Sequence, residues 1–277
     1  MSKLLYFLKS RAILGKEPQN FLGAAWVNSL LKKIPKTGKR LWALRILSLS
    51  PHYFFQNAGY KKLSYNQFLE AEFQRNQESR TKIYNYILEK HFNKNFVVMD
   101  YGCGPGFLAR VVAPDVKKVY ACDISTGVLA CAGIINSAPN IEYILANEQG
   151  LKAIPSGTID IIYSIAVIQH VTDNVLEMIL DTCNDKLKPG GKLIVQVQLD
   201  VSSWRSEKEW QSDKSIQGKI KYKYGLNCFS RKEDSLRQIF TRHSFVNISV
   251  ESIADMVNED FDDICTKHLL IAYKNRI

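Results

Sequence analysis

Short apolar runs of strand length alternate with helix starts across the middle of the chain. The runs at 96–99, 118–123 and 140–145 end in turns or polar residues, as buried strands do. The first run leads through a glycine turn into residues able to start a helix, and Ser125 is a good cap for a helix over 126–136. Strands that alternate with helices predict an α/β domain with a mostly parallel sheet.

The same alternation continues in the C-terminal half. We expect Asp173 to cap a helix whose apolar residues repeat at helical spacing, and a Pro-Gly-Gly turn then leads into a buried strand at 187–195. Ser230 is expected to cap a later helix, and 245–250 and 268–273 are the last two strands. The residues of the Asp173 helix stripe are Leu176, Ile179, Leu180, Cys183 and Leu187.

Two basic amphipathic stretches precede this pattern, at 21–34 and 39–49, with a predicted linker at 35–38 between them. A long helix with an interrupted apolar stripe is expected over 65–90. Apolar faces with basic rims either bind membrane surfaces or pack on a neighbouring domain. Because a core domain follows, we interpret these stretches as a helical lid over that domain.

Charge is distributed unevenly along the 277 residues. The net charge is +10, yet residues 1–62 hold twelve Lys and Arg and one acidic residue, which is +11. The remaining chain holds 25 basic and 26 acidic residues, which is −1. The basic segment therefore suggests an anionic surface or partner, and weak contact with a membrane surface through residues 1–62 is one expectation.

Cysteine usage indicates a reduced compartment. The six cysteines form no CxxC pair and no Cys/His spacing typical of zinc sites, so we expect no metal site. No apolar run is long enough to span a membrane, and the start lacks the features of a secretion signal. These observations favour a cytoplasmic protein.

The first strand ends in a glycine-rich turn, Asp100-Tyr101-Gly102-Cys103-Gly104-Pro105-Gly106. A strand, a glycine turn and a helix start form a ligand site in open α/β sheets. Phe107 stands where the dinucleotide fingerprint has its third glycine, and the GxxxxGK[ST] phosphate loop is absent. The Asp-x-Gly-x-Gly-x-Gly pattern resembles motif I of the class I S-adenosylmethionine-dependent methyltransferases.

The resemblance implies a set of cofactor contacts. Asp123 ends the second strand, where a nucleoside site needs a carboxylate for the ribose hydroxyls, although it can instead cap the next helix. Asn147 stands where many relatives have an Asp near the adenine, and Glu148 is a substitute for it. Arg80 is a candidate partner of the cofactor carboxylate. The full set predicted to bind S-adenosyl-L-methionine is Asp100, Gly102, Cys103, Gly104, Gly106, Asp123, Ile124, Asn147, Glu148, Ser164 and Arg80.

Residues 157–171 resemble the fourth-strand segment of that family, whose end faces the transferred methyl group. His170 lies just after this strand, and histidine titrates near neutrality, so it is the candidate general base. The alternative is that His170 forms part of the site wall. Gln169 beside it is a candidate for orienting the substrate or contacting the cofactor.

The resemblance also implies the overall architecture. It predicts a Rossmann-like, seven-stranded, mostly parallel sheet that is flanked by helices, closed by a C-terminal hairpin and preceded by the helical lid. Residues 1–64 are then the basic extension or lid, and 65–277 the class I methyltransferase domain. An insertion at about 200–226 carries four aromatic residues that either line a pocket or anchor a loop: Trp204, Trp210, Tyr222 and Tyr224.

The acceptor class follows partly from absent motifs. The chain lacks the [DNS]-Pro-Pro-[YF] segment of base amino methylation and a Pro-Cys pair for attack on pyrimidines, so a nucleic-acid partner is not expected. The layout resembles the branch that methylates O, N or C atoms of secondary metabolites, quinones and lipids. We expect a hydrophobic small-molecule acceptor. A catalytically idle cofactor-binding relative, a nucleotide-cofactor oxidoreductase and a nucleic-acid methyltransferase are the alternatives.

Overall fold

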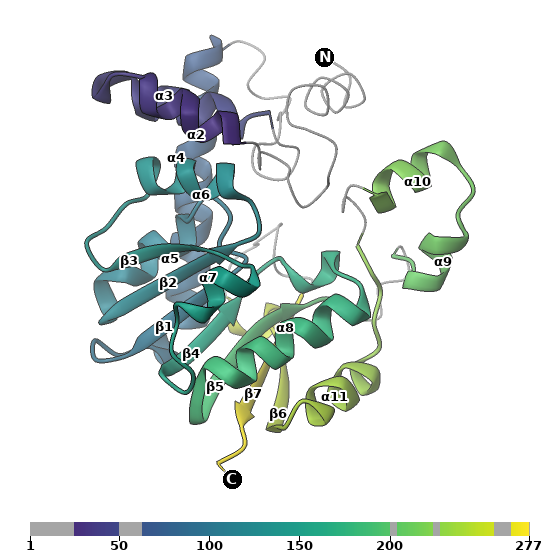
Figure 1. Ribbon diagram of the computed structural model, residues 1–277. Helices are drawn as coiled ribbons and strands as arrows, with labels where there is room; N and C mark the ends of the chain where they lie inside the picture. The colour runs from purple at the N-terminus through teal and green to yellow at the C-terminus, as the bar shows by residue number, and fades with distance from the viewer. Residues whose placement is uncertain (1–24, 50–62, 200–203, 224–227, 258–266, 277) are drawn as a thin grey trace.

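A computed structural model describes residues 25–49, 63–199, 204–223, 228–257 and 267–276. Its centre is one seven-stranded sheet in the order β3-β2-β1-β4-β5-β7-β6 (Figure 1). The five strands from β3 to β5 are parallel, whereas β7 runs antiparallel to both β5 and β6. The strands are β1 (Val97–Tyr101), β2 (Lys118–Asp123), β3 (Ile141–Leu145), β4 (Ile159–Ser164), β5 (Leu187–Val197), β6 (Phe245–Ser252) and β7 (His268–Lys274).

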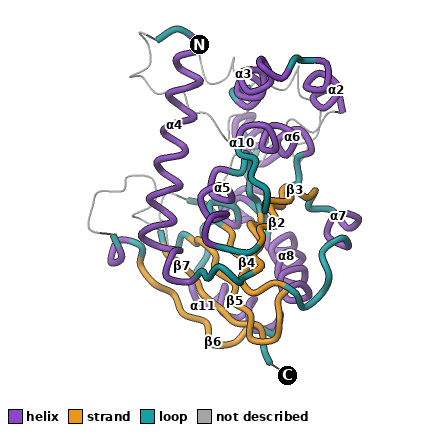
Figure 2. Tube along the Cα trace, turned by 90° about the vertical axis from the view of Figure 1, so that its left-hand side faces the viewer, coloured by secondary structure: helices purple, strands orange, loops and turns teal. Residues whose placement is uncertain are grey.

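Helices cover both faces of the sheet, because its buried strands are apolar on both sides. One core cluster joins the sheet to α4, α5 and α6, and the other joins it to α8 and α11 (Figures 1 and 2). The helices are α2 (Ala25–Lys33), α3 (Lys36–Leu47), α4 (Tyr65–Ile83), α5 (Phe107–Val112), α6 (Thr126–Ile135), α7 (Glu148–Lys152), α8 (Asp173–Lys186), α9 (Glu207–Ser212), α10 (Ile216–Lys223) and α11 (Glu233–Arg242).

The predicted seven-stranded, mostly parallel sheet with flanking helices is therefore confirmed. The crossover at β1 decides where a site can form: β2 lies on one side of it and β4 on the other. Chain connections diverge from this point, which leaves a crevice at the carboxyl ends of the strands. The predicted cap Ser125 is also confirmed, since its hydroxyl accepts a hydrogen bond from the Val128 N–H.

Several predicted boundaries were wrong. Thr172 rather than Asp173 caps α8, because its side chain accepts from the Val175 N–H. Lys232 rather than Ser230 precedes α11 and makes no side-chain cap. The linker expected at 35–38 is shorter than predicted. Helix α3 begins at Lys36 with Pro35 at its N-cap position, so Gly38 lies inside the helix.

The long helix expected over 65–90 is present but changes its winding. The α-helical part α4 ends at Ile83, a π-helical turn follows over Tyr84–Leu88, and a 3-10 turn closes at His91. A capping box at Ser64 and Gln67 starts it. The inner face of α4 also buries two polar residues, Glu72 and Asn76, which the apolar pattern did not indicate.

The described part of the basic segment forms α2 and α3, which pack on α6 and α4. Leu44 and Leu47 of α3 are buried against Val128 and Cys131 of α6, so the two helices cover the helix that follows β2 (Figure 1). Residues 1–24 and 50–62 of the predicted lid lie outside the described residues. Among the described helices, none has the length and apolarity needed to cross a membrane.

The predicted insertion contains α9 and α10, which lie to one side of the carboxyl edge of the sheet (Figure 1). A second capping box, at Ser206 and Glu209, starts α9. Trp210 of α9 donates its indole N–H to the Cys228 carbonyl at 3.0 Å. This tryptophan therefore anchors the insertion to the chain that returns to α11.

Two buried tyrosines of the core should respond oppositely to loss of the hydroxyl. Tyr163 is fully buried, and no described polar group bonds its hydroxyl, whereas the Tyr84 hydroxyl donates to Asp115 at 2.8 Å. We expect Tyr163→Phe to raise the free energy of unfolding by about 1 kcal/mol and Tyr84→Phe to lower it by about as much. Urea unfolding of both variants tests this, and a Tyr163→Phe variant less stable than Tyr84→Phe would contradict it.

Candidate functional site

The candidate site lies at the carboxyl ends of β1, β2 and β4. The glycine loop leaves β1 and is tied to β2, because the N–H groups of Gly102 and Cys103 both donate to the Cys122 carbonyl at 2.8 and 2.9 Å. A second tie comes from α6, where the Asn136 amide donates to the Pro105 carbonyl at 2.8 Å. The loop is therefore fixed from both sides before any ligand arrives.

Close packing and positive φ explain the glycines. Gly102 has φ 81°, and a Cβ there would stand 2.4 Å from Val167 Cγ2, in the loop that follows β4. Gly106 has φ 77°, and its Cβ would stand 2.3 Å from the Tyr143 hydroxyl. Any side chain at either position would displace these neighbours and strain the backbone. The loop thus packs closely against Val167 after β4 and against Tyr143 of β3.

Asp123 ends β2 and faces the glycine loop. One carboxylate oxygen accepts from the Gly104 N–H at 3.0 Å, and the other accepts from the Ser125 N–H at 2.9 Å. The side chain is buried, and this burial raises its pKa while the backbone N–H groups oppose the shift. Each oxygen keeps a second lone pair, so a vicinal diol still finds two acceptors here. Asp123 therefore holds the loop and can also receive a ribose.

Asp100 is the more deeply buried carboxyl, at 3% exposure. Its Oδ2 makes no hydrogen bond within the described part of the chain. Burial raises the pKa of Asp100 to about 8, the nearby Asp123 charge adds to this, and Arg80 and the Ala109 N–H act against it. Arg80 of α4 thus lies within electrostatic reach of Asp100, which brings this predicted residue to the site. A cationic ligand group would satisfy Asp100.

The other predicted cofactor residues differ in setting. Ile124 follows Asp123, and its large apolar side chain is 54% exposed. Asn147 caps α7 and accepts from the Gly150 N–H, while Glu148 is exposed and pairs with Lys152. Ser164 is buried and donates to the Tyr101 carbonyl at 2.8 Å, which joins β4 to β1.

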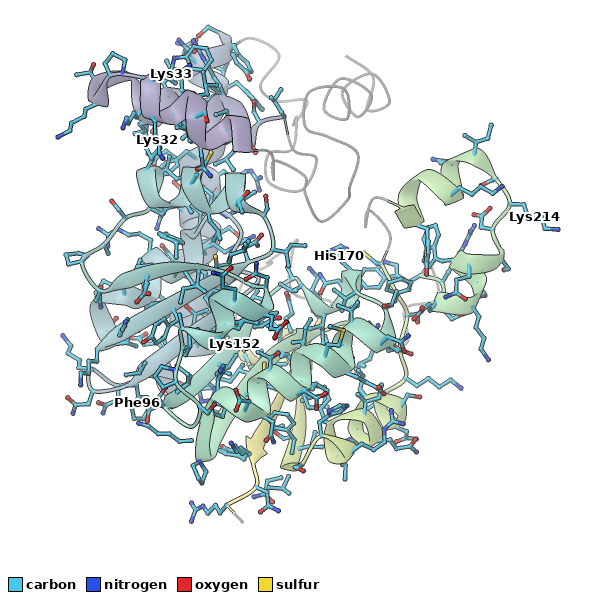
Figure 3. All side chains as sticks on the ribbon, in the orientation of Figure 1. Lys32, Lys33, Phe96, Lys152, His170 and Lys214 are labelled. Atoms are coloured by element: carbon cyan, nitrogen blue, oxygen red, sulfur yellow. The ribbon has the colours of Figure 1, made fainter. Side chains whose placement is uncertain are left out.

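The candidate catalytic residues lie in a short 3-10 turn, Ile168–His170, after β4. His170 is at the carboxyl edge of the sheet, between the N-terminal helices and the α9–α10 insertion (Figure 3). Its Nδ1 lies 3.6 Å from Cys228 Sγ. Gln169 is buried, and its side-chain oxygen has no bonding partner among the described residues. The sequence order of β4 and this turn thus brings both residues to the same edge as Asp123.

Sequence reasoning missed three residues that shape this turn. Ala166 has φ 62°, a strained conformation for a residue with a side chain, and its N–H donates to Gln196 at 2.8 Å. The Gln196 side chain comes from β5 and is buried. Arg231, far along the chain, donates to the carbonyls of the turn. Neither spacing nor composition indicates these contacts, because each partner comes from a distant element.

The buried Asp100 makes stability depend on pH. Its folded pKa of about 8 lies above the ordinary value near 3.8, so the folded chain binds the proton more tightly than the unfolded chain. The protonated Asp100 therefore contributes its full stability below pH 3.8. As pH rises from there towards 8, this stability is lost, and the ratio of folded to unfolded protein falls by up to about tenfold per pH unit.

Asp100→Asn should remove this dependence in the ligand-free protein. We expect the variant to gain stability relative to the natural chain as pH rises from 5 to 8, because it has no carboxyl to ionise at this position. Denaturant unfolding at several pH values measures the difference. A gap between the two proteins that stays constant across this range would contradict the account.

A family model described as a methyltransferase domain matches residues 66–250, more than half of the chain. Among curated proteins, the ubiquinone biosynthesis O-methyltransferase of Vibrio parahaemolyticus is 30% identical over 128 residues, covering 44% of this chain and 53% of that protein. The enzyme of the same name from Xanthomonas axonopodis pv. citri is 30% identical over 100 residues, covering 35% and 41%. The chain spans about half or less of these relatives.

Solved structures share the fold at low identity. An S-adenosylmethionine-dependent methyltransferase from Mesorhizobium loti aligns with a TM-score of 0.54 and 16% identity, covering 72% of this chain and all of that one. A second, from Archaeoglobus fulgidus, aligns with a TM-score of 0.50 and 16% identity, covering 76% and 100%. The family match, the sheet order and the contact between the glycine loop and Asp123 all point to the same family. The chain belongs to the class I S-adenosylmethionine-dependent methyltransferases, and its cofactor is S-adenosylmethionine.

Proposed function

We propose that this enzyme transfers the methyl group of S-adenosylmethionine to a hydroxyl oxygen of a hydrophobic small molecule. The observation that carries the proposal is the position of His170 at the same sheet edge as the glycine loop and Asp123. The names of the curated relatives, which are O-methyltransferases of ubiquinone biosynthesis, favour oxygen over nitrogen or carbon and a quinone-like acceptor.

The residues of the edge fit the cofactor. Asp123 would accept the two ribose hydroxyls, and the exposed face of Ile124 would pack against the adenine. The Asp100 oxygen that lacks a described partner suits the cofactor's amino group, and Arg80 suits its carboxylate. The Asn147 oxygen already accepts from Gly150, so any adenine contact there would use its second lone pair. Glu148, paired with Lys152 in solvent, is the weakest of the predicted contacts.

When bound, S-adenosylmethionine supplies a methyl group on a sulfonium, which is a good leaving group. The protein then mainly holds the acceptor oxygen in line with the methyl–sulfur bond, and such positioning supplies much of the rate acceleration. His170 takes the hydroxyl proton on a ring nitrogen as the new oxygen–carbon bond forms. Gln169 orients the hydroxyl through its buried amide. The products are the methyl ether, protonated His170 and S-adenosylhomocysteine, the thioether that leaves because the methyl–sulfur bond breaks as the oxygen–carbon bond forms.

An anionic membrane surface is the second partner that we propose. The exposed Lys32 and Lys33 lie at the end of α2 (Figure 3). Trp42 of α3 is 40% exposed. The net charge of residues 1–62 has the sign that an anionic surface attracts. A weak contact of this kind would bring the enzyme to a lipid-like acceptor without anchoring it.

The proposal is tested with labelled methyl donor and paired acceptors. Catechol, alkylated catechols of increasing chain length and the matching anilines are offered to the purified enzyme. Methylation of the catechols that improves with chain length is the expected result. Transfer to the anilines alone, or to none of the compounds, would contradict an oxygen acceptor.

Asp123→Ala should weaken cofactor binding by at least about tenfold, because the variant loses both the ribose acceptors and the bond to Gly104. Calorimetric titration with S-adenosylhomocysteine measures this. Asp115→Asn is the matched control, since Asp115 bonds only Tyr84 among the described side chains and lies away from this edge. An affinity equal to that of the control would remove Asp123 from the cofactor site.

His170→Ala should lower kcat about a hundredfold while the affinity for S-adenosylhomocysteine stays within twofold, because the base acts on the acceptor and not on the cofactor. The natural enzyme should also lose activity at acidic pH, where the base is protonated, and the variant should not show this loss. Turnover of catechol between pH 5 and 9 tests both points. Equal turnover of the two proteins across this range would exclude His170 as the base.

A further inference from the structure

One arginine outside the family's motifs binds the loop that carries His170. Arg231 lies just before α11, and its side chain is only 8% exposed. Its two terminal nitrogens donate to the Ile168 carbonyl at 2.8 Å and the Val171 carbonyl at 2.5 Å. Its Nε donates to Asp173 at 2.8 Å, at the start of α8. The guanidinium therefore spans the whole turn from before Gln169 to after His170.

The same segment makes two more contacts with the turn. The Phe229 N–H donates to the Gln169 carbonyl at 2.8 Å, and Cys228 Sγ lies 3.6 Å from His170 Nδ1. Residues 228–231 thus approach the carbonyls and the imidazole of the turn from one side. The Arg231 guanidinium also lies over the Phe229 ring, at 5.5 Å from its centroid, which fixes its orientation.

This segment also joins the turn to the insertion. Trp210 of α9 donates to the Cys228 carbonyl, and the Ser230 N–H donates to the Arg205 carbonyl at 2.9 Å. Glu207 at the start of α9 accepts from the Asp173 N–H at 3.0 Å. Helix α9 and the residues just before it are therefore joined to the segment around the turn at several points.

The contacts from Arg231 add to those that the described residues of the turn make among themselves and with β5. Within it, the His170 N–H donates to the Val167 carbonyl, and the strained Ala166 is held by Gln196. The carbonyls of Ile168 and Val171 receive their side-chain bonds from Arg231. The three nitrogens of the planar guanidinium reach two carbonyls and a carboxylate that lie apart, whereas the three N–H groups of a lysine all leave one nitrogen and cannot span the same positions.

We propose that Arg231 is the positioning residue of the catalytic turn: it fixes the backbone that presents Gln169 and His170 and connects that backbone to the α9 insertion. The role of His170 rests on the proposed function, but the effect of Arg231 on the turn does not. Arg231 acts through the turn and holds neither cofactor nor acceptor.

The experiment compares Arg231→Lys with Arg237→Lys in the full chain bound to S-adenosylhomocysteine. Arg237 is a matched control, because it donates to the Ile248 carbonyl at 2.6 Å and to Glu233, within the α11–β6 pair. Hydrogen exchange of peptides spanning 165–172 is the first measurement. We expect exchange at least fivefold faster in Arg231→Lys and unchanged in Arg237→Lys, with affinity for S-adenosylhomocysteine within twofold in both.

Turnover of catechol is the second measurement. Arg231→Lys should lower kcat at least tenfold with little change in KM for S-adenosylmethionine, and guanidinium ions at millimolar concentration should restore part of the activity of Arg231→Ala. Unchanged exchange over 165–172, or a fall in kcat equal to that of Arg237→Lys, would overturn the role of Arg231. If the natural enzyme does not methylate catechol, the proposed acceptor fails and the exchange measurement alone decides the role of Arg231.

Discussion

The joint between the glycine loop and the end of β2 is the contact on which the site depends. The Cys122 carbonyl receives two loop N–H groups, and the Asp123 carboxylate bridges the Gly104 and Ser125 N–H groups. Each bond fixes a backbone group that would otherwise be free to turn, so the loop is preorganised for its ligand. Because Asp123 also starts the turn into α6, this joint sets the position of the helix on which α2 and α3 pack.

A second joint, between the turn after β4 and residues 228–231, completes the edge. The side chain of Val167 fills the space in front of Gly102, so the glycine loop packs directly against the segment that leads into the His170 turn. Arg231 donates to the carbonyls of Ile168 and Val171 in the same segment. A cofactor held by the first joint and an acceptor presented to the second would therefore meet at a fixed distance, which in-line transfer requires.

The sheet, and the position of the glycine loop and Asp123 at the ends of its strands, could be predicted from the sequence because short stretches of neighbouring residues encode them. Apolar runs predicted six of the seven strands in their correct places, and the family resemblance predicted the fourth. The glycine loop and Asp123 lie in adjacent elements whose order fixes their neighbours. The sequence did not predict the Arg231 contacts or the strained Ala166, because their partners come from segments far apart in the chain. It also did not predict that Glu72 is buried, although the partner of Glu72, Arg75, lies on the same helix. The cap positions at Thr172 and Lys232 differed from prediction by one and two residues, since neighbouring polar residues compete for the same role.

The most direct measurement of the central claim is calorimetric titration of the purified protein with S-adenosylhomocysteine and, separately, with NAD. The account predicts one site for S-adenosylhomocysteine and none for NAD, because Asp123 and the glycine loop fit a nucleoside while Phe107 replaces the glycine that a dinucleotide requires. Binding of NAD, or of neither compound, would contradict the assignment of this sheet edge to the methyl donor.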